Sequence, residues 1–212
     1  VANGVILITT KKGKEGKTHI ELNASIGFSQ PWRIPSFLNA RQFATMANEI
    51  YTNSGLTPNP EWADAGSLGK GTDMLDLIFR DAPRQNYDLS ISGGNSKLTS
   101  RLSLGYSQQD GIIIETSYKR YNAKEAIDFK PNDKIHIGGS VAFAATHSKG
   151  QNTDAMQGGI LNLAEQFFPT LSRDSAFYGD ALYYTKDGDN PILRAKTIDN
   201  ELYNYRLFGN VF

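Results

Sequence analysis

The residues best suited to bind a metal in this sequence are its three histidines, because neutral imidazole is a common metal ligand. They are His19, His136 and His147, and no two of them have the i, i+4 spacing of a helical zinc site. His19 and His136 fall in stretches that we expect to be strands. We therefore interpret these two as polar strand residues, and we predict no metal site.

Three other patterns come close to known sites without completing them. Asp187–Asn190 starts like a calcium loop, but a proline occupies the position of the third ligand and no glutamate closes the loop. Gly69–Gly71 lacks the preceding strand and the Ser or Thr of a phosphate-binding loop. No serine stands in a G-x-S-x-G context, and no acid pair stands out among the carboxylates. We predict no catalysis and no cofactor.

The charge balance and the lack of cysteine exclude several kinds of partner. The 212 residues include 22 Lys plus Arg and 22 Asp plus Glu, so no net field gathers nucleic acid. We therefore predict no nucleic-acid partner. The absence of cysteine removes disulfides and thiolate metal sites, but it does not identify the compartment.

No stretch of the chain approaches the roughly 18 consecutive apolar residues of a membrane-spanning helix. This excludes helical spans but not a membrane barrel, whose alternating strands give a much weaker signal per segment. The chain begins at Val1 without a methionine or signal peptide, and it ends at Phe212 within a strand-like stretch. We therefore expect it to be a fragment of a longer protein.

Alternation of apolar and polar residues predicts a series of long strands. In the stretch 18–29, for example, Leu22 and Ile26 fall on one side, while Glu21 and Asn23 fall on the other. The same pattern recurs along the chain, and we expect strands at about 17–29, 84–93, 97–109, 118–130, 134–146 and 203–212.

The connections between these strands alternate between short and long. Short turns at Gly93–Lys97 and Pro131–Asp133 contrast with long loops at 30–83 and 147–200. The first long loop contains an amphipathic helix from Asn39, as N-cap, to about Asn53, and a helical turn over 73–80. Loops as long as these usually have a function.

Strand length and turn asymmetry together predict the architecture. Strands of about 10 to 13 residues joined alternately by short turns and longer loops are typical of outer-membrane barrels, whereas strands of soluble sandwiches average about 5 or 6 residues. We predict an all-β fold, a partial transmembrane antiparallel β-barrel with a short helix and long loops. The alternative is a soluble, secreted all-β binding module in which the alternating faces pack a sandwich core. One charged residue, Glu125, interrupts the apolar side of its strand.

Several short motifs follow one another in a familiar order and spacing. They are Val1–Gly13, Ala82–Tyr87, Ser92–Gly94, Gly105–Tyr106, Gly111–Ile113 and Tyr118–Asn122. The first closely resembles the end of the plug domain in the SusC/RagA family of TonB-dependent outer-membrane transporters of Bacteroidota. The others resemble the first barrel strands of that family. Beyond Thr146 the sequence shows no specific resemblance.

The resemblance implies a plug domain inside a large barrel of the plugged class, with about 22 strands. Residues 1–14 would form the C-terminal end of the plug, and residues 15–212 would form the N-terminal part of the barrel. Val5–Thr10, which is apolar on both sides, would then be enclosed by protein, and Thr18–Ser29 would be the first wall strand.

The resemblance also implies a function and partners. The family imports large nutrients across the bacterial outer membrane by TonB-dependent active transport, and we expect an oligosaccharide or glycan here, with a peptide as the alternative. The expected partners are a SusD-like surface lipoprotein that acts as a lid, the TonB complex, which binds a segment upstream of Val1, and outer-membrane lipid.

Two sets of side chains are candidates for contact with substrate or lid. Aromatic residues of the second long loop could form platforms for sugar rings or pack under the lid, with packing inside the loop as the alternative. They are Phe167, Phe168, Tyr178, Tyr183 and Tyr184. Arg101, Arg120 and Lys124 on the polar strand faces would face the lumen, where such residues also pair with one another or with the plug.

Overall fold

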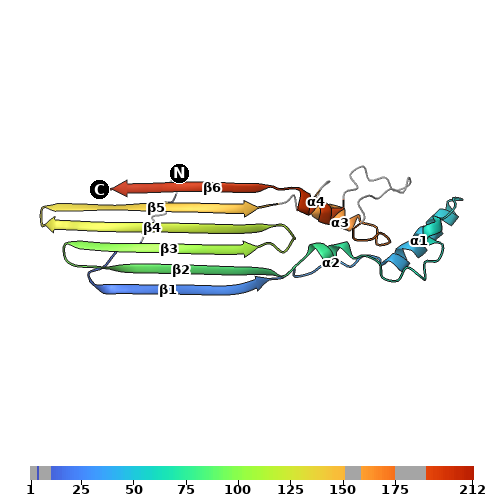
Figure 1. The fold of residues 1–212 in the computed structure, drawn as a ribbon, viewed down its shortest axis with the longest axis horizontal. Helices are drawn as coiled ribbons and strands as arrows, with labels where there is room; N and C mark the ends of the chain where they lie inside the picture. The colour runs from blue at the N-terminus through green and yellow to red at the C-terminus, as the bar shows by residue number, and fades with distance from the viewer. Residues whose placement is uncertain (1–3, 5–10, 151–158, 175–189) are drawn as a thin grey trace.

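The structure, a computed structural model, describes residues 4, 11–150, 159–174 and 190–212. These residues form one antiparallel sheet whose six strands follow one another in chain order, with the helices gathered beyond one end (Figure 1). The strands are β1 (Gly16–Ser29), β2 (Ala82–Gly94), β3 (Leu98–Asp110), β4 (Ser117–Asn132), β5 (Ile135–Lys149) and β6 (Glu201–Val211).

Each strand begins and ends within three residues of the range that alternation predicts. The strands have 11 to 16 residues, about two to three times the length of about 5 or 6 that is usual in soluble sheets. The predicted all-β fold with long antiparallel strands is therefore confirmed.

The pairing register divides the side chains between two unlike faces. Directly paired residues lie on the same face, and one row of such pairs across the sheet is wholly apolar. It consists of Leu22, Leu89, Leu104, Ala123, Phe143 and Leu207. We call the face that carries this row the apolar face. Glu125 lies in the next row of this face, directly opposite Leu102 and Val141.

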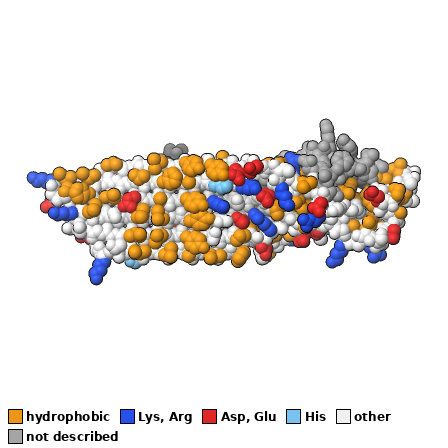
Figure 2. All heavy atoms as spheres, viewed as in Figure 1, with side chains coloured by type: hydrophobic (Ala, Val, Ile, Leu, Met, Phe, Trp, Pro, Cys, Tyr) orange, Lys and Arg blue, Asp and Glu red, His pale blue; other side chains and the backbone are white. Residues whose placement is uncertain are grey.

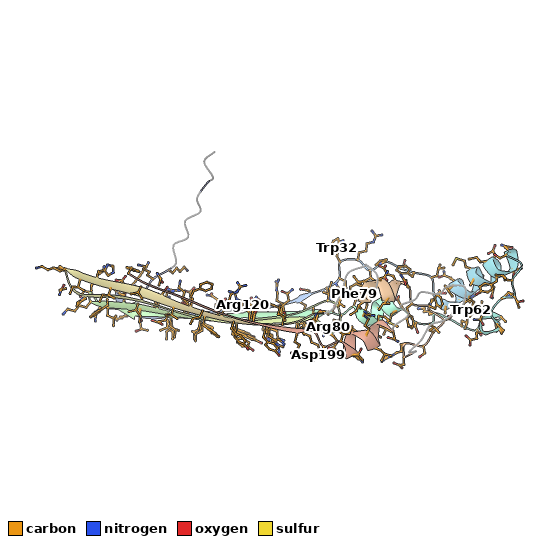
Figure 3. The ribbon with its side chains drawn as sticks, turned by 90° about the horizontal axis from the view of Figure 1, so that it is seen from above. Trp32, Trp62, Phe79, Arg80, Arg120 and Asp199 are labelled. Carbon is orange, nitrogen blue, oxygen red and sulfur yellow. The ribbon has the colours of Figure 1, made fainter. Side chains whose placement is uncertain are left out.

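The other face, which we call the polar face, carries small, hydrogen-bonding and charged side chains. One of its rows consists of Asn23, Asp88, Gly105, Asn122, Ala144 and Arg206. The sheet is a single layer, as the edge-on view shows (Figure 3). Each strand therefore has one apolar side and one polar side. In the described residues, no second sheet packs against either side.

The apolar face is open rather than packed. Leu22 is 67% exposed, Leu104 is 40% exposed and Leu207 is 71% exposed. Figure 2 shows this face, with hydrophobic side chains in bands across the strands and charged side chains gathered nearer the helices. A soluble sandwich would cover such a face, so the exposure favours a lipid environment over the soluble alternative.

Short and long connections lie at opposite ends of the sheet. Residues 95–97 and 133–134 turn the chain at one end, whereas residues 30–81, 111–116 and 150–200 connect strands at the other. The helices of the described residues lie at this second end (Figure 1). The predicted asymmetry of the connections is present.

The helices are α1 (Ala40–Asn53), a 3-10 turn η1 (Pro60–Trp62), α2 (Met74–Ile78), α3 (Ile160–Glu165) and α4 (Pro191–Thr197). Asn39 caps α1 as predicted, with a capping box in which its side chain accepts from the Gln42 backbone N–H at 2.9 Å. In the part of the chain that the structure describes, no helix is long and apolar enough to cross a membrane.

The described parts of the long loops build most of the buried core. One cluster joins all three long-side connections and consists of Met74, Leu75, Ile78, Ile113, Ile160, Ala164, Phe167 and Ala195. A second consists of Ala44, Ala47, Tyr51 and Trp62. Two of the helices, α3 and α4, lie within the second predicted long loop, and at six and seven residues they are too short to give a clear period in the sequence.

Candidate functional site

The polar face holds the three basic residues that the sequence suggested for the lumen. Arg101 lies opposite Ser92 and Ala126, Arg120 lies on β4 opposite Ser107, and Lys124 lies in a neighbouring row. The register thus places all three on the same face. Whether that face is the lumen of a barrel stays a prediction.

The basic side chains of this face lie among hydrogen-bonding and acidic groups, and the Arg101 charge interacts with the Glu21 carboxylate of the same face. The Arg101 guanidinium donates to the Ser90 hydroxyl at 3.0 Å, and no carboxylate within 4 Å pairs with Arg101, Arg120 or Lys124 among the ion pairs there. Neutral groups form a further network, in which the Ser107 hydroxyl donates to the Asn86 side chain at 2.7 Å. The face therefore offers cationic and hydrogen-bonding groups to a passing polar molecule.

A cleft opens among the helices, between the first and second long loops. Its volume is about 690 Å³, and its walls include Phe37, Phe43, Met74, Phe167 and Phe168. A cleft of this size and apolar lining falls within the range of ligand sites in proteins.

Three contacts hold the walls of the cleft together. The Thr72 backbone N–H donates to the Pro169 carbonyl at 2.9 Å, and the Thr72 hydroxyl donates to the Leu171 carbonyl at 2.7 Å. The ring of Phe43 packs against that of Phe168 with 5.2 Å between centroids. Gly71 lies at φ +66°, where a Cβ atom would clash with the Pro169 carbonyl.

The aromatic residues predicted to contact substrate or lid differ in their burial. Phe167 is only 6% exposed and belongs to the buried core of the loops, while Phe168 is half-buried against Phe43. Both also line the cleft, so their contact with a substrate or lid stays a prediction. Tyr178, Tyr183 and Tyr184 lie outside the described residues.

Two tryptophans at the helical end were not among the candidate contact residues from the sequence. Trp62 is buried and meets the Phe43 ring edge to face at 5.4 Å, whereas Trp32 is 99% exposed (Figure 3). The signal for Trp32 was its place between Pro31 and Pro35, since proline stiffens the loop that presents it.

A row of tyrosines crosses the apolar face beside the helical end of the sheet. Tyr87 stacks on Tyr106 at 6.3 Å, and Tyr106 meets Tyr121 at 5.0 Å. In the next row towards the helices, the side chains of β2 to β5 are polar, and they are Gln85, Gln108, Lys119 and His147. This order, from aliphatic through tyrosine to polar, is that of a membrane–water interface.

Ionisable groups at the helical end form pairs rather than metal sites. The Lys149 ammonium donates to Glu115 at 2.7 Å, and this hydrogen bond lowers the pKa of the Glu115 carboxyl below its ordinary value. His147 lies 3.1 Å from Glu201 and stacks on Tyr203. No group of three or more His, Asp or Glu in the described ranges could hold a metal ion.

Known proteins with similar sequences are receptors of bacteria. No protein-family model matches the sequence. The TonB-dependent receptor SusC of Bacteroides thetaiotaomicron is 29% identical over 235 residues, covering 99% of this chain and 22% of SusC. The TonB-dependent receptor P3 of Formosa agariphila is 28% identical over 208 residues, covering 93% of this chain and 19% of the receptor. The chain is similar in sequence to TonB-dependent receptors, SusC among them.

Solved structures of the RagAB transporter share the fold. The RagAB peptide transporter matches 95% of this chain with a TM-score of 0.68 and 19% identity, over 27% of its own chain. The RagAB peptide importer in its open-open state matches 71% of this chain with a TM-score of 0.57 and 22% identity, over 20% of its own chain. The chain spans about a fifth of the length of its curated SusC-type relatives, which are named as receptors and not as enzymes.

Proposed function

We propose that this chain forms part of the wall of an outer-membrane transporter of the SusC/RagA type, which imports a large nutrient by TonB-dependent transport. The observation that supports this most is the sheet itself. Its strands of 11 to 16 residues have an open apolar face, bounded by tyrosines, and an opposite face of polar and basic residues. In a closed barrel the first face would meet lipid, and the second would surround plug and substrate.

We further propose the division of the chain that the motifs suggested. Residues 1–14 would end the plug, and residues 15–212 would begin the barrel. The contact between Gly13 and the backbone of Ser100 supports this division, because it brings the chain before β1 directly against the sheet. The partners would be outer-membrane lipid, the TonB complex and a SusD-like lipoprotein over the helical end.

For the substrate we propose an oligosaccharide, with a peptide as the alternative. The hydrogen-bonding groups of the polar face and the aromatic walls of the cleft suit sugar hydroxyls and ring faces. The alternative draws on the RagAB relatives, which are named as a peptide importer and transporter.

Deleting the gene in its native cell tests the proposal. We expect loss of growth on one glycan as sole carbon source, growth on glucose unchanged, and the same loss when TonB is deleted. A loss confined to peptide medium would select the alternative substrate. Recovery of the intact protein from the soluble fraction without detergent would contradict the membrane location and favour a soluble binding module.

A further inference from the structure

The segment just before β1 lies on the polar face of the sheet, near the end away from the helices. We call residues 11–15 the strap. A Cβ atom added to Gly13 would lie 2.5 to 2.7 Å from the backbone O, C and N of Ser100 in β3. Real Cβ atoms do not approach other atoms so closely, so only glycine lets the strap rest on the strand here.

The charge of Lys12 attaches the strap to two further strands. Its ammonium lies 3.7 Å from the Asp128 carboxylate of β4 and 4.6 Å from the centre of the Phe212 ring, next to the end of β6. An ion pair and a cation–π contact thus hold the same side chain. Lys12 and Gly13 together reach across β3, β4 and the end of β6.

The receiving groups are held in place by the wall itself. The His136 imidazole lies 2.7 Å from the other oxygen of Asp128, and its ring meets Phe212 edge to face at 5.7 Å. The backbones of Phe212 and Gly138 exchange hydrogen bonds of 2.8 and 2.9 Å, and Gly138 leaves room for the Phe212 ring. The strap therefore meets a site whose main groups hold one another in position.

We propose that Asp128, Phe212 and the backbone at Ser100 form a docking site for the strap, which anchors the chain before β1 to the polar face. Docking as such depends only on these contacts. The consequence of docking for transport rests on the proposed function. During transport the strap would stay bound to the barrel wall, so movement of the plug would begin on the N-terminal side of Lys12.

Trypsin tests the docking, because the strap and its surroundings contain the cleavage sites Lys11, Lys12, Lys14 and Lys17. The intact native protein would be purified in detergent, digested briefly and analysed by mass spectrometry. We expect Asp128→Asn to raise cleavage at these sites several-fold, because it removes the charge that holds Lys12. The matched control is Asp88→Asn, an exposed carboxylate of the same face, and we expect it to cleave like wild type.

Two more variants separate loss of docking from damage to the wall. Lys12→Gln leaves Asp128 and His136 intact and should raise cleavage at the three remaining lysines. Gly13→Ala should do the same by steric contact with Ser100. Equal cleavage of wild type and both Asp128→Asn and Lys12→Gln would overturn the proposal.

A transport measurement keeps this proposal distinct from the proposed function. If TonB-dependent growth does not require the wild-type gene, the proposed function is wrong. The trypsin comparison still tests docking in that case. If the gene is needed and docking is confirmed, we expect Asp128→Asn to change uptake more than Asp88→Asn. Equal uptake by these two variants would overturn the proposed role in plug movement.

Discussion

At the residue scale, two backbone positions with positive φ shape the helical end. Gly71 lies in a wall of the cleft at φ +66°, and Glu115 adopts φ +57° in the turn between β3 and β4. Residues other than glycine rarely adopt positive φ. Contacts from other elements lie at both positions: the Pro169 carbonyl accepts from the Thr72 backbone N–H next to Gly71, and the Lys149 ammonium donates to Glu115.

Gly71→Ala should destabilise the packing of the two long loops by about 2 to 3 kcal/mol, because it adds a clash with Pro169 to the cost of positive φ. Gly69→Ala is the matched control. Gly69 has φ +61° but open space around its Cβ position, so only the backbone cost of about 1 kcal/mol applies. Thermal unfolding of the intact protein in detergent would compare them, and equal shifts would contradict the close approach.

The Glu115–Lys149 pair should make stability depend on acidic pH. The folded pKa of Glu115 lies below the ordinary 4.5, so its contribution is fully present above that value and is lost as pH falls through the folded pKa. Glu115→Gln should therefore lower the unfolding temperature at pH 7, and lower it less at pH 3. Both partners are about one-third exposed, so the effect should stay below about 1 kcal/mol. The same difference at both pH values would contradict it.

At the element scale, neighbouring residues of one strand face different surroundings. Leu89 lies on the apolar face between Leu22 and Leu104, while Asp88 lies on the polar face between Asn23 and Gly105. Period-two alternation requires this separation, and cross-strand pairing extends it over all six strands.

Leu89→Arg should impair membrane assembly by about 1 to 2 kcal/mol, because Leu89 lies one row from the tyrosines, and the cost of a basic residue on a lipid-facing strand falls from the midplane towards the interface. Asp88→Arg is the control, and it should assemble because its side chain stays on the polar face. Heat-dependent migration of the membrane fraction on a gel measures folded barrel. Normal assembly of Leu89→Arg would show that this face does not meet lipid.

At the scale of the whole molecule, the described sheet has a large open apolar face and two outer strands, β1 and β6, each paired on one side only. Such edges pair readily with other chains. Residues 1–212 expressed alone should therefore aggregate in buffer and stay dispersed only in detergent. Size-exclusion chromatography would show this, and a stable monomer without detergent would favour the soluble alternative.

The amino-acid sequence by itself determined the strands, the first helix and the two faces of the sheet. Alternation and the Asn39 cap are local signals, and each can be detected within about a dozen residues. Glu125 was also recognised from the sequence as the charged interruption of an apolar row.

Only the tertiary structure decided what the long loops build and where the strap lies. Thr72, in a wall of the cleft, bonds to Leu171, which is 99 positions away, and the helices α3 and α4 at this end are too short to have a clear period. Likewise, the lysine and glycine before β1 predicted no particular contact until pairing of β3, β4 and β6 brought Ser100, Asp128 and Phe212 together. Contacts of this kind depend on the register of distant strands, which no local pattern specifies.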